Sequence, residues 1–142
     1  MKRQSMLFLI ATVVFAACGS ADAPTDISRA LSGDRNLRGA NLTGAALSEV
    51  DLRGANLTEA RLTGAHLDSA DLTGANLTNA TLTNATLTYT NLINANLTGA
   101  NLTGADVAGA DFTGATLSGV NFSGVRCSFL TRWPAGFTRP DC

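Results

Sequence analysis

Residues 36–60 read NLRGANLTGAALSEVDLRGANLTEA, and every fifth residue of this stretch, from Leu37 on, is Leu. The same spacing continues to Phe122, with a large apolar residue at the centre of each unit and usually Ala two residues before it. Asn or Asp often precedes the central residue, Thr or Ser often follows it, and Gly often closes the unit. A repeat of fixed period sets the architecture of a whole chain, so it is the first feature to interpret.

A five-residue period fits neither of the regular elements. In an α-helix, a step of five residues turns the chain by about 140°, so the leucines would point in all directions. In a flat strand, side chains alternate between two faces, so successive leucines would lie on opposite sides. The pattern instead predicts short extended pieces joined by bends, with Leu and Ala inward and the other three positions outward. Gly and Asn suit such bends because they tolerate positive φ.

Eighteen consecutive units follow the pattern Ala-Asp/Asn-Leu-x-x, for example residues 55–59 (ANLTE) and 70–74 (ADLTG). In this pattern the chain closely resembles the pentapeptide repeat family from about Arg35 to Ser128. The resemblance implies an all-β fold, a right-handed quadrilateral β-helix with four units per coil, in which residues twenty apart stack vertically. Eighteen units would then form about four and a half coils, above the roughly three repeats that stability requires. At ~4.8 Å per coil the rod would be roughly 22 Å tall.

Residues 1–17 have the pattern of an export signal. The basic pair Lys2-Arg3 precedes a twelve-residue, mostly apolar run. Such a run is too short to cross a ~30 Å hydrocarbon core but is typical of a signal peptide. It ends at Phe15-Ala16-Ala17-Cys18-Gly19, which resembles the lipobox of bacterial lipoproteins, whose Cys is acylated and becomes the mature N-terminus. We therefore expect a lipoprotein signal peptide and a lipid on Cys18. Ordinary cleavage nearby, for example after Ala21, and an unmodified Cys18 are the alternatives.

Two short segments connect this leader to the repeats. Residues 18–24 are small and polar and are interpreted as a tether, and residues 25–34 as an N-terminal cap. Within the cap, the sequence predicts a two-turn helix with Thr25 as its N-cap and Gly33 as its C-terminal stop. A cap is required because the ends of a solenoid expose strand edges and core side chains.

The repeats end in a segment of different composition. We assign residues 35–126 to the β-helix and residues 127–142 to a C-terminal cap loop. The cap resembles a Trp-Pro-x-Gly-Phe tail that often follows pentapeptide arrays, and this resemblance implies that Trp133 and Phe137 cover the last coil. A ligand-stacking role for Trp133 is the alternative.

Two cysteines flank this cap. Cys127 stands at the inward apolar position of a nineteenth unit, and Cys142 is the last residue given. If Cys18 carries lipid, the other two cysteines pair evenly in an oxidising compartment. A bond between them closes a loop of about fifteen residues, for which chain entropy predicts ~3 kcal/mol. The alternative is two free thiols.

The sequence offers no catalytic constellation. Its single histidine, His66, stands at an outward position. Neither Cys127 nor Cys142 has a His neighbour in the sequence, and the glycines belong to the repeat and not to a phosphate-binding loop. We therefore predict a protein that is not an enzyme, with no catalytic residue, no cofactor and no metal ligand.

Stacking by twenty residues aligns outward side chains into ladders, which are the candidate interaction surfaces. A threonine ladder would order water or lie along a polysaccharide; its members are Thr43, Thr63, Thr83 and Thr103. An acidic ladder lies on a different side and holds Asp51, Asp71 and Asp111. The alternative is that these threonines have no binding role and are present because Thr suits outward strand positions. Without Lys2 and Arg3, eight basic and eleven acidic residues leave a net charge of −3, far from a polyanion.

These features together predict a single-domain bacterial lipoprotein of the cell envelope, anchored by Cys18 on the extracytoplasmic side of a membrane. Its rigid rod would be a non-enzymatic scaffold or protein-interaction surface, with an envelope protein or a polysaccharide as partner. A secreted protein is the alternative location. The second function is a glycan- or ice-binding surface on the threonine ladders. The third, suggested by family members with acidic columns, is a DNA mimic that protects topoisomerases, although a nucleic-acid partner is not expected.

Overall fold

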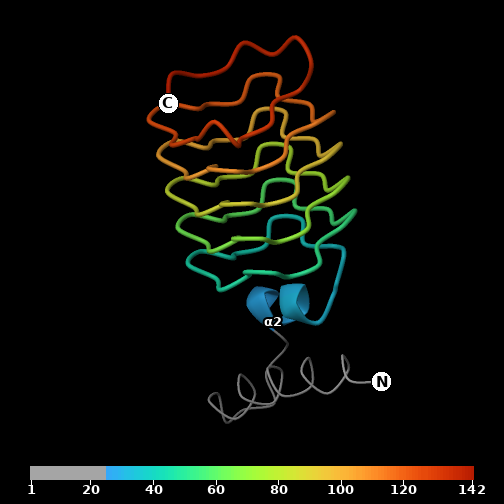
Figure 1. The fold of residues 1–142 in the computed structure, drawn as a ribbon. Helices are drawn as coiled ribbons and strands as arrows, with labels where there is room; N and C mark the ends of the chain where they lie inside the picture. Colours follow the sequence, from blue (N-terminus) through green and yellow to red (C-terminus); the bar gives the residue numbers. More distant parts are fainter. Residues whose placement is uncertain (1–24) are drawn as a thin grey trace, which may run out of the picture.

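The computed structural model describes residues 25–142, which form a stack of four-sided coils above one short helix (Figure 1). The colours change steadily from the helix to the C-terminal end, so the coils stack in chain order. The expected signal peptide, the lipidation site Cys18 and the tether at residues 18–24 lie outside the described residues.

Residues twenty apart pair in parallel, so four units make one coil. Single-residue bridges follow one another from Asn36↔Asn56 to Asp106↔Arg126. The described residues contain these bridges in place of longer strands. Around Leu77, for example, its N–H donates to the Asn96 carbonyl at 2.7 Å, and the N–H of Asn96 donates to Ala75 at 2.9 Å. This is the quadrilateral β-helix that the resemblance to the pentapeptide repeat family implies.

A tight turn joins each unit to the next. The N–H of Ala80 donates to the carbonyl of Leu77, three residues earlier, at 2.9 Å. The residue between them at the second central position, Asn79, has φ 56°. A positive φ at that position alone is the property of a type II turn, which favours Gly or Asn there. Most units have Gly at this corner position, but Tyr89 occupies the same position in its unit and also has a positive φ, of 56°.

The core is a column of leucines with alanines beside them. The central residue of every unit from Leu37 to Phe112 is 0% exposed. One polar side chain replaces a core alanine without loss of hydrogen bonding: the buried Thr90 hydroxyl donates to the Leu67 carbonyl at 2.7 Å. The inside of the rod is therefore filled by apolar side chains, and the polar residues lie outside.

The helix α2, residues Asp26–Leu31, lies under the first coil (Figure 1). Thr25 is its N-cap, because the Thr25 hydroxyl accepts the Ser28 N–H at 3.2 Å. Ala30 is fully buried, while Ile27 and Leu31 pack against the core cluster. The capping signals of the sequence therefore lie where the structure uses them.

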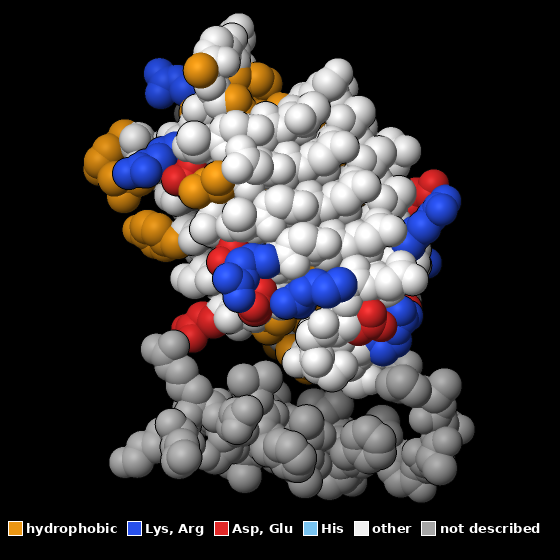
Figure 2. Space-filling model, turned by 90° about the vertical axis from the view of Figure 1, so that its right-hand side faces the viewer, with side chains coloured by type: hydrophobic (Ala, Val, Ile, Leu, Met, Phe, Trp, Pro, Cys, Tyr) orange, Lys and Arg blue, Asp and Glu red, His pale blue; other side chains and the backbone are white. Residues whose placement is uncertain are grey.

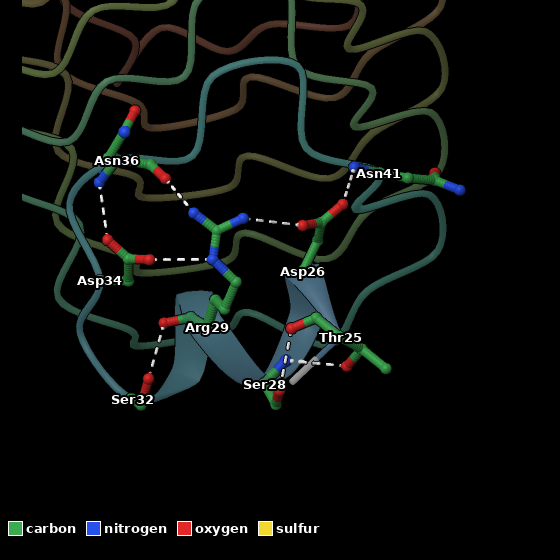
Figure 3. Close-up of polar contacts among 8 residues, drawn as sticks. All are labelled: Thr25, Asp26, Ser28, Arg29, Ser32, Asp34, Asn36 and Asn41. Carbon is green, nitrogen blue, oxygen red and sulfur yellow. Dashed lines mark hydrogen bonds and ion pairs between the residues drawn. The ribbon is translucent and has the colours of Figure 1, made fainter. Parts of the chain in front are cut away.

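Two carboxylates of this cap close the open edge of the first coil (Figure 3). Asp34 accepts the Asn36 N–H at 2.9 Å, and Asp26 accepts the Asn41 N–H at 2.8 Å. In later coils the equivalent N–H groups donate to the preceding coil, which the first coil lacks. Arg29 connects both carboxylates, at 3.0 Å to Asp26 and 2.9 Å to Asp34, and also donates to the Asn36 carbonyl. The Asn36 N–H, followed by Arg29, holds the pKa of Asp34 below its usual value.

At the other end, coil pairing continues into residues 127–142, the segment that the sequence assigns to the C-terminal cap loop. Asp111 pairs with Arg132, twenty-one residues away instead of twenty. The extra residue lies in a turn at residues 129–130, closed by a hydrogen bond of 3.0 Å from the Thr131 N–H to the Ser128 carbonyl. The insertion is absorbed at a corner, so the next side of the coil stays in register.

Aromatic stacking and a disulfide then close the C-terminal end. Trp133 stacks on Phe112, with ring centroids 5.0 Å apart and planes 2° apart, and Phe137 stacks on Trp133 at 5.4 Å. The disulfide joins Cys127 to Cys142, whose Cα atoms are 5.4 Å apart. The predicted pairing of these cysteines is therefore confirmed.

Candidate interaction surfaces

The threonine ladder lies on one side of the rod, one residue in each coil. The corner N–H groups of Gly44, Gly64 and Asn84 each donate at 2.9 Å to a threonine carbonyl in the following coil. The three acceptors are Thr63, Thr83 and Thr103. These hydrogen bonds place Thr43, Thr63, Thr83 and Thr103 in consecutive coils, at the repeat distance of neighbouring strands, ~4.8 Å.

Many of the threonine hydroxyls on the rod already have a partner in their own unit. Thr103 donates its hydroxyl to Asn101 at 2.6 Å, and the Thr103 N–H donates to the same oxygen at 3.0 Å. Thr78 and Thr98 repeat this arrangement with the Asn two residues earlier. The Asn and Thr positions of the repeat thus form a local hydrogen-bonded clasp. It uses the hydroxyl proton internally and leaves only acceptor lone pairs for a ligand.

The acidic ladder is largely paired with arginine. Asp51 accepts two hydrogen bonds from Arg53, at 3.0 and 2.7 Å, and lies 3.3 Å from Arg35. The Arg53 hydrogen bonds hold the pKa of Asp51 well below its usual range. Arg53 also lies 3.8 Å from Asp71. Two arginines therefore neutralise much of the N-terminal half of this ladder.

Asp111, at the other end of the ladder, has a similar environment. Partial burial raises the pKa of Asp111, but hydrogen bonds from Thr113 and the nearby Arg132 guanidinium outweigh burial and lower it. Arg132 lies 3.4 Å from the carboxylate. The column is thus a row of ion pairs rather than an anionic strip.

His66 is exposed and has one neighbouring hydroxyl, that of Thr86, 3.4 Å from Nδ1. The Thr86 hydroxyl donates to Asp68 at 2.6 Å, and Thr88 donates to the other oxygen of the same carboxylate at 2.5 Å. The hydroxyl proton of Thr86 therefore points to Asp68 and not to the imidazole. Among residues 25–142, no three potential metal ligands of the His, Cys, Asp or Glu type gather in one place.

Sequence reasoning missed one surface feature, an edge of exposed apolar side chains that we call the aromatic edge: Tyr89, Phe129 and Leu130. Their exposed fractions are 64%, 92% and 49%. All three occupy turns at the same corner of the rod, because residues 89 and 129 are separated by two coils. In Figure 2, hydrophobic side chains protrude as separate groups along one edge, with a charged pair beside the upper group. The available signal was a large aromatic residue, Tyr89, at a corner position that usually holds Gly.

Tyr89 lies against the glycine of the following coil. A Cβ added to Gly109 would lie only 2.6 Å from the Tyr89 ring, whereas one added to Gly54 would meet nothing within 4 Å. The corners of the next coil at residues 99, 104 and 114 are also glycines, and each lies against an Asn side chain. The corner residues of this coil, Asn79, Asn84, Tyr89 and Asn94, thus each lie over a glycine of the next coil.

This contact makes a prediction about glycine substitution. Gly54→Ala should cost about 1 kcal/mol, because both glycines have positive φ. Gly109→Ala should cost more, because the Tyr89 ring must move. In a double-mutant cycle measured by chemical denaturation, Tyr89→Ala should recover at least ~0.5 kcal/mol of the extra cost. Equal costs for the two glycines, with no coupling to Tyr89, would contradict the contact.

An open hollow of ≈ 660 Å³ lies at the C-terminal end of the aromatic edge. Phe129 and Ser128 line one part of it, and Arg139, Asp141 and the disulfide line the rest. Its volume lies within the usual range for small-ligand sites, roughly 300–1,000 Å³.

Comparison with known proteins adds a family match. The family model described as pentapeptide repeats matches eight copies of the repeat, over residues 36–74, 65–104 and 90–126. No curated protein matches the chain. Within residues 25–142, helices long and apolar enough for a membrane span are absent.

Several solved structures are similar to this chain. A pentapeptide repeat protein (Rfr23) from the cyanobacterium Cyanothece 51142 is 35% identical, with 69% of this chain and 63% of that chain covered and a TM-score of 0.40. A pentapeptide repeat protein from the Arabidopsis thaliana thylakoid lumen is 24% identical over 78% of this chain and 70% of its own, with a TM-score of 0.47. One from Nostoc PCC 7120 is 29% identical over 82% and 93%, with a TM-score of 0.38. The chain thus spans under two thirds of the Cyanothece structure.

Proposed function

The chain belongs to the pentapeptide repeat family, and from that premise we propose that it is a non-enzymatic lipoprotein of the bacterial cell envelope. Its rod, of about four and a half coils, presents rigid outer faces to a partner. Cys18 holds the rod on the extracytoplasmic side of a membrane. The proteins of this family are generally non-catalytic scaffolds.

One observation carries this proposal: apolar side chains fill the inside of the rod, and a regular arrangement of polar side chains covers its outside. The central side chains from Leu37 to Phe112 are fully buried, so the interior holds core packing and the chemistry available to a partner lies on the surface. That surface is rigid, because hydrogen bonds of 2.7–3.0 Å join successive coils along the repeats. A preorganised surface loses little conformational freedom on binding, which favours an interaction role.

The other two functions receive less support. Of the four ladder threonines, Thr103 already donates its hydroxyl proton to Asn101, which weakens a glycan- or ice-binding role at that end of the ladder. A DNA mimic needs a continuous anionic surface, whereas Asp51 and Asp111 are paired with arginines. We therefore place the scaffold function first.

The disulfide supports the proposed location. Disulfides persist in oxidising compartments such as the bacterial periplasm and the cell surface, and are rare in the cytosol. A bond between Cys127 and Cys142 therefore fits a protein that has been exported by the leader in residues 1–17.

The proposal is tested by measuring whether the protein carries a lipid on Cys18. Cells given labelled palmitate should incorporate it into the wild-type protein, which should fractionate with membranes, because two or more acyl chains anchor a protein stably. Cys18→Ser should lose the label and appear as an uncleaved precursor or as soluble protein. Cys127→Ser serves as the matched control and should keep the label. Unlabelled wild-type protein in the cytosol, with residues 1–17 intact, would overturn the envelope proposal.

A further inference from the structure

We propose that the aromatic edge and the hollow beside it bind an uncharged, extended glycan strand. This inference rests on the proposed function, because it names a ligand for the non-enzymatic binding surface. It places that ligand at Tyr89, Phe129 and Leu130, and not on the threonine ladder.

The first argument is the exposure of the rings. Phe129 is 92% exposed and Tyr89 64% exposed, whereas most outward positions of the repeats hold Asn, Thr, Ser or Gly. Exposed aromatic rings offer a flat apolar face at small cost in side-chain entropy, and Tyr adds a polar hydroxyl. The sugar units of a glycan offer the complementary surface, an apolar face of C–H groups bordered by hydroxyls.

The second argument is the spacing of the rings along the rod. Tyr89 and Phe129 lie two coils apart, about 10 Å at the spacing of neighbouring strands. The Tyr89 ring leans over Gly109 in the intervening coil, which brings it closer to Phe129. The two residues thus occupy the same corner along the rod, a spacing that an extended chain of sugar units can bridge.

The third argument is the polar groups beside the rings. The hollow next to Phe129 is lined by Ser128, Arg139 and Asp141. A hydroxyl, a guanidinium and a carboxylate together supply both donors and acceptors for sugar hydroxyls. The hollow, of ≈ 660 Å³, is open to solvent and its lining is mainly polar beside the single ring of Phe129, which suits the hydroxyls of a sugar. We place one end of the glycan in this hollow, with the following units against Leu130 and Tyr89.

Charge indicates which polymer fits. Ion pairs flank the edge on both sides, Asp106 with Arg126 at 3.2 Å and Asp111 with Arg132 at 3.4 Å. Positive and negative groups are therefore balanced here, which favours an uncharged ligand over nucleic acid or an anionic lipid surface. A protein partner fits less well, because a stable protein interface buries about 800 Å² on each side around a continuous apolar centre. The aromatic edge has only three exposed large apolar side chains among the described residues, too few for such a centre.

The test uses the folded full chain and two probes, the linear hexamers of β-1,4-linked glucose and of N-acetylglucosamine, with binding measured by calorimetry. We expect wild type to bind at least one hexamer. Tyr89→Ala and Phe129→Ala should each weaken binding about five-fold, and the double variant should bind more weakly than either. Binding of both hexamers would indicate that the rings read the shared sugar shape. Binding of the N-acetylglucosamine hexamer alone would indicate that the hollow also contacts the acetamido group.

Two controls keep the result interpretable. Phe129→Tyr keeps the ring and should retain binding, and Thr63→Ala, on a different side of the rod, should leave affinity unchanged. Each variant must first show a wild-type melting curve. Folded wild type that binds neither hexamer, or variants of unchanged affinity, would overturn the inference. Sedimentation that shows a wild-type dimer dissociated by Phe129→Ala would also overturn it, because the edge would then join two copies. None of these outcomes alters the palmitate result, so the envelope proposal is tested separately.

Discussion

Leu82→Lys should unfold the rod or destabilise it by about 3–5 kcal/mol, the cost of leaving a buried charge without a partner. Leu82 is 0% exposed and lies in the middle of the leucine column. The carbonyls around it already accept backbone hydrogen bonds, for example that of Leu82 from the Ala85 N–H at 3.0 Å. An ammonium group at this site therefore has neither water nor a carboxylate. A chemical denaturation curve measures the loss.

The matched control is Thr83→Lys, one residue further along the same unit. Thr83 is partly exposed, and within residues 25–142 its hydroxyl makes no side-chain hydrogen bond. A lysine there reaches water, so stability should change by no more than ~0.5 kcal/mol. Two equally stable variants would show that the inward and outward positions of the repeat are misassigned.

Reduction of the Cys127–Cys142 bond should lower the free energy of unfolding by ~3 kcal/mol, because the bond closes a loop of about fifteen residues in the unfolded chain. The separation of the two cysteines is fifteen residues. Each kcal/mol lowers the melting temperature of a domain of this size by roughly 4–8 °C. Thermal melts with and without reductant should therefore differ clearly.

A variant with both Cys127→Ala and Cys142→Ala provides the control. It should melt at a lower temperature than oxidised wild type and show no response to reductant. The stack of Phe112, Trp133 and Phe137 also closes this end of the rod and should keep it folded in part. Identical melting curves for oxidised and reduced wild type would contradict a stabilising role for the bond.

The strict period made most of the fold predictable. A residue such as Leu77 could be placed inward from spacing alone, because every neighbouring unit repeats the same geometry. The pairing of Asn36 with Asn56 followed from four units per coil, which the period does not determine and which the resemblance to the pentapeptide repeat family implied. The Cys127–Cys142 bond was predicted on the condition that Cys18 carries lipid, which leaves two cysteines to pair.

Features outside the period were not predictable in the same way. The capping signals located α2, but they did not reveal that Asp26 and Asp34 reach the N–H groups of the first coil. Such contacts depend on how the helix is oriented under the rod. The position where coil pairing ends could not be predicted either. A sequence pattern does not show whether an extra residue, such as the one at 129–130, ends a coil or enlarges a corner. Tyr89 was missed because the repeat pattern does not distinguish one residue from another at a corner position that usually holds Gly.

The two ends of the rod are closed by different chemistry. Asp34 has a lowered pKa, so its contribution to stability is complete above the ordinary carboxyl range and is lost as pH falls through the folded-state value. The opposite end depends on aromatic stacking and on a bond that a reductant breaks. In a solenoid each coil contacts only its neighbours, so damage at one end reaches the other only through the coils between them. The two ends of the rod are therefore destabilised by different conditions. Low pH weakens the end nearest the proposed membrane anchor, and a reductant weakens the end that carries the proposed binding site.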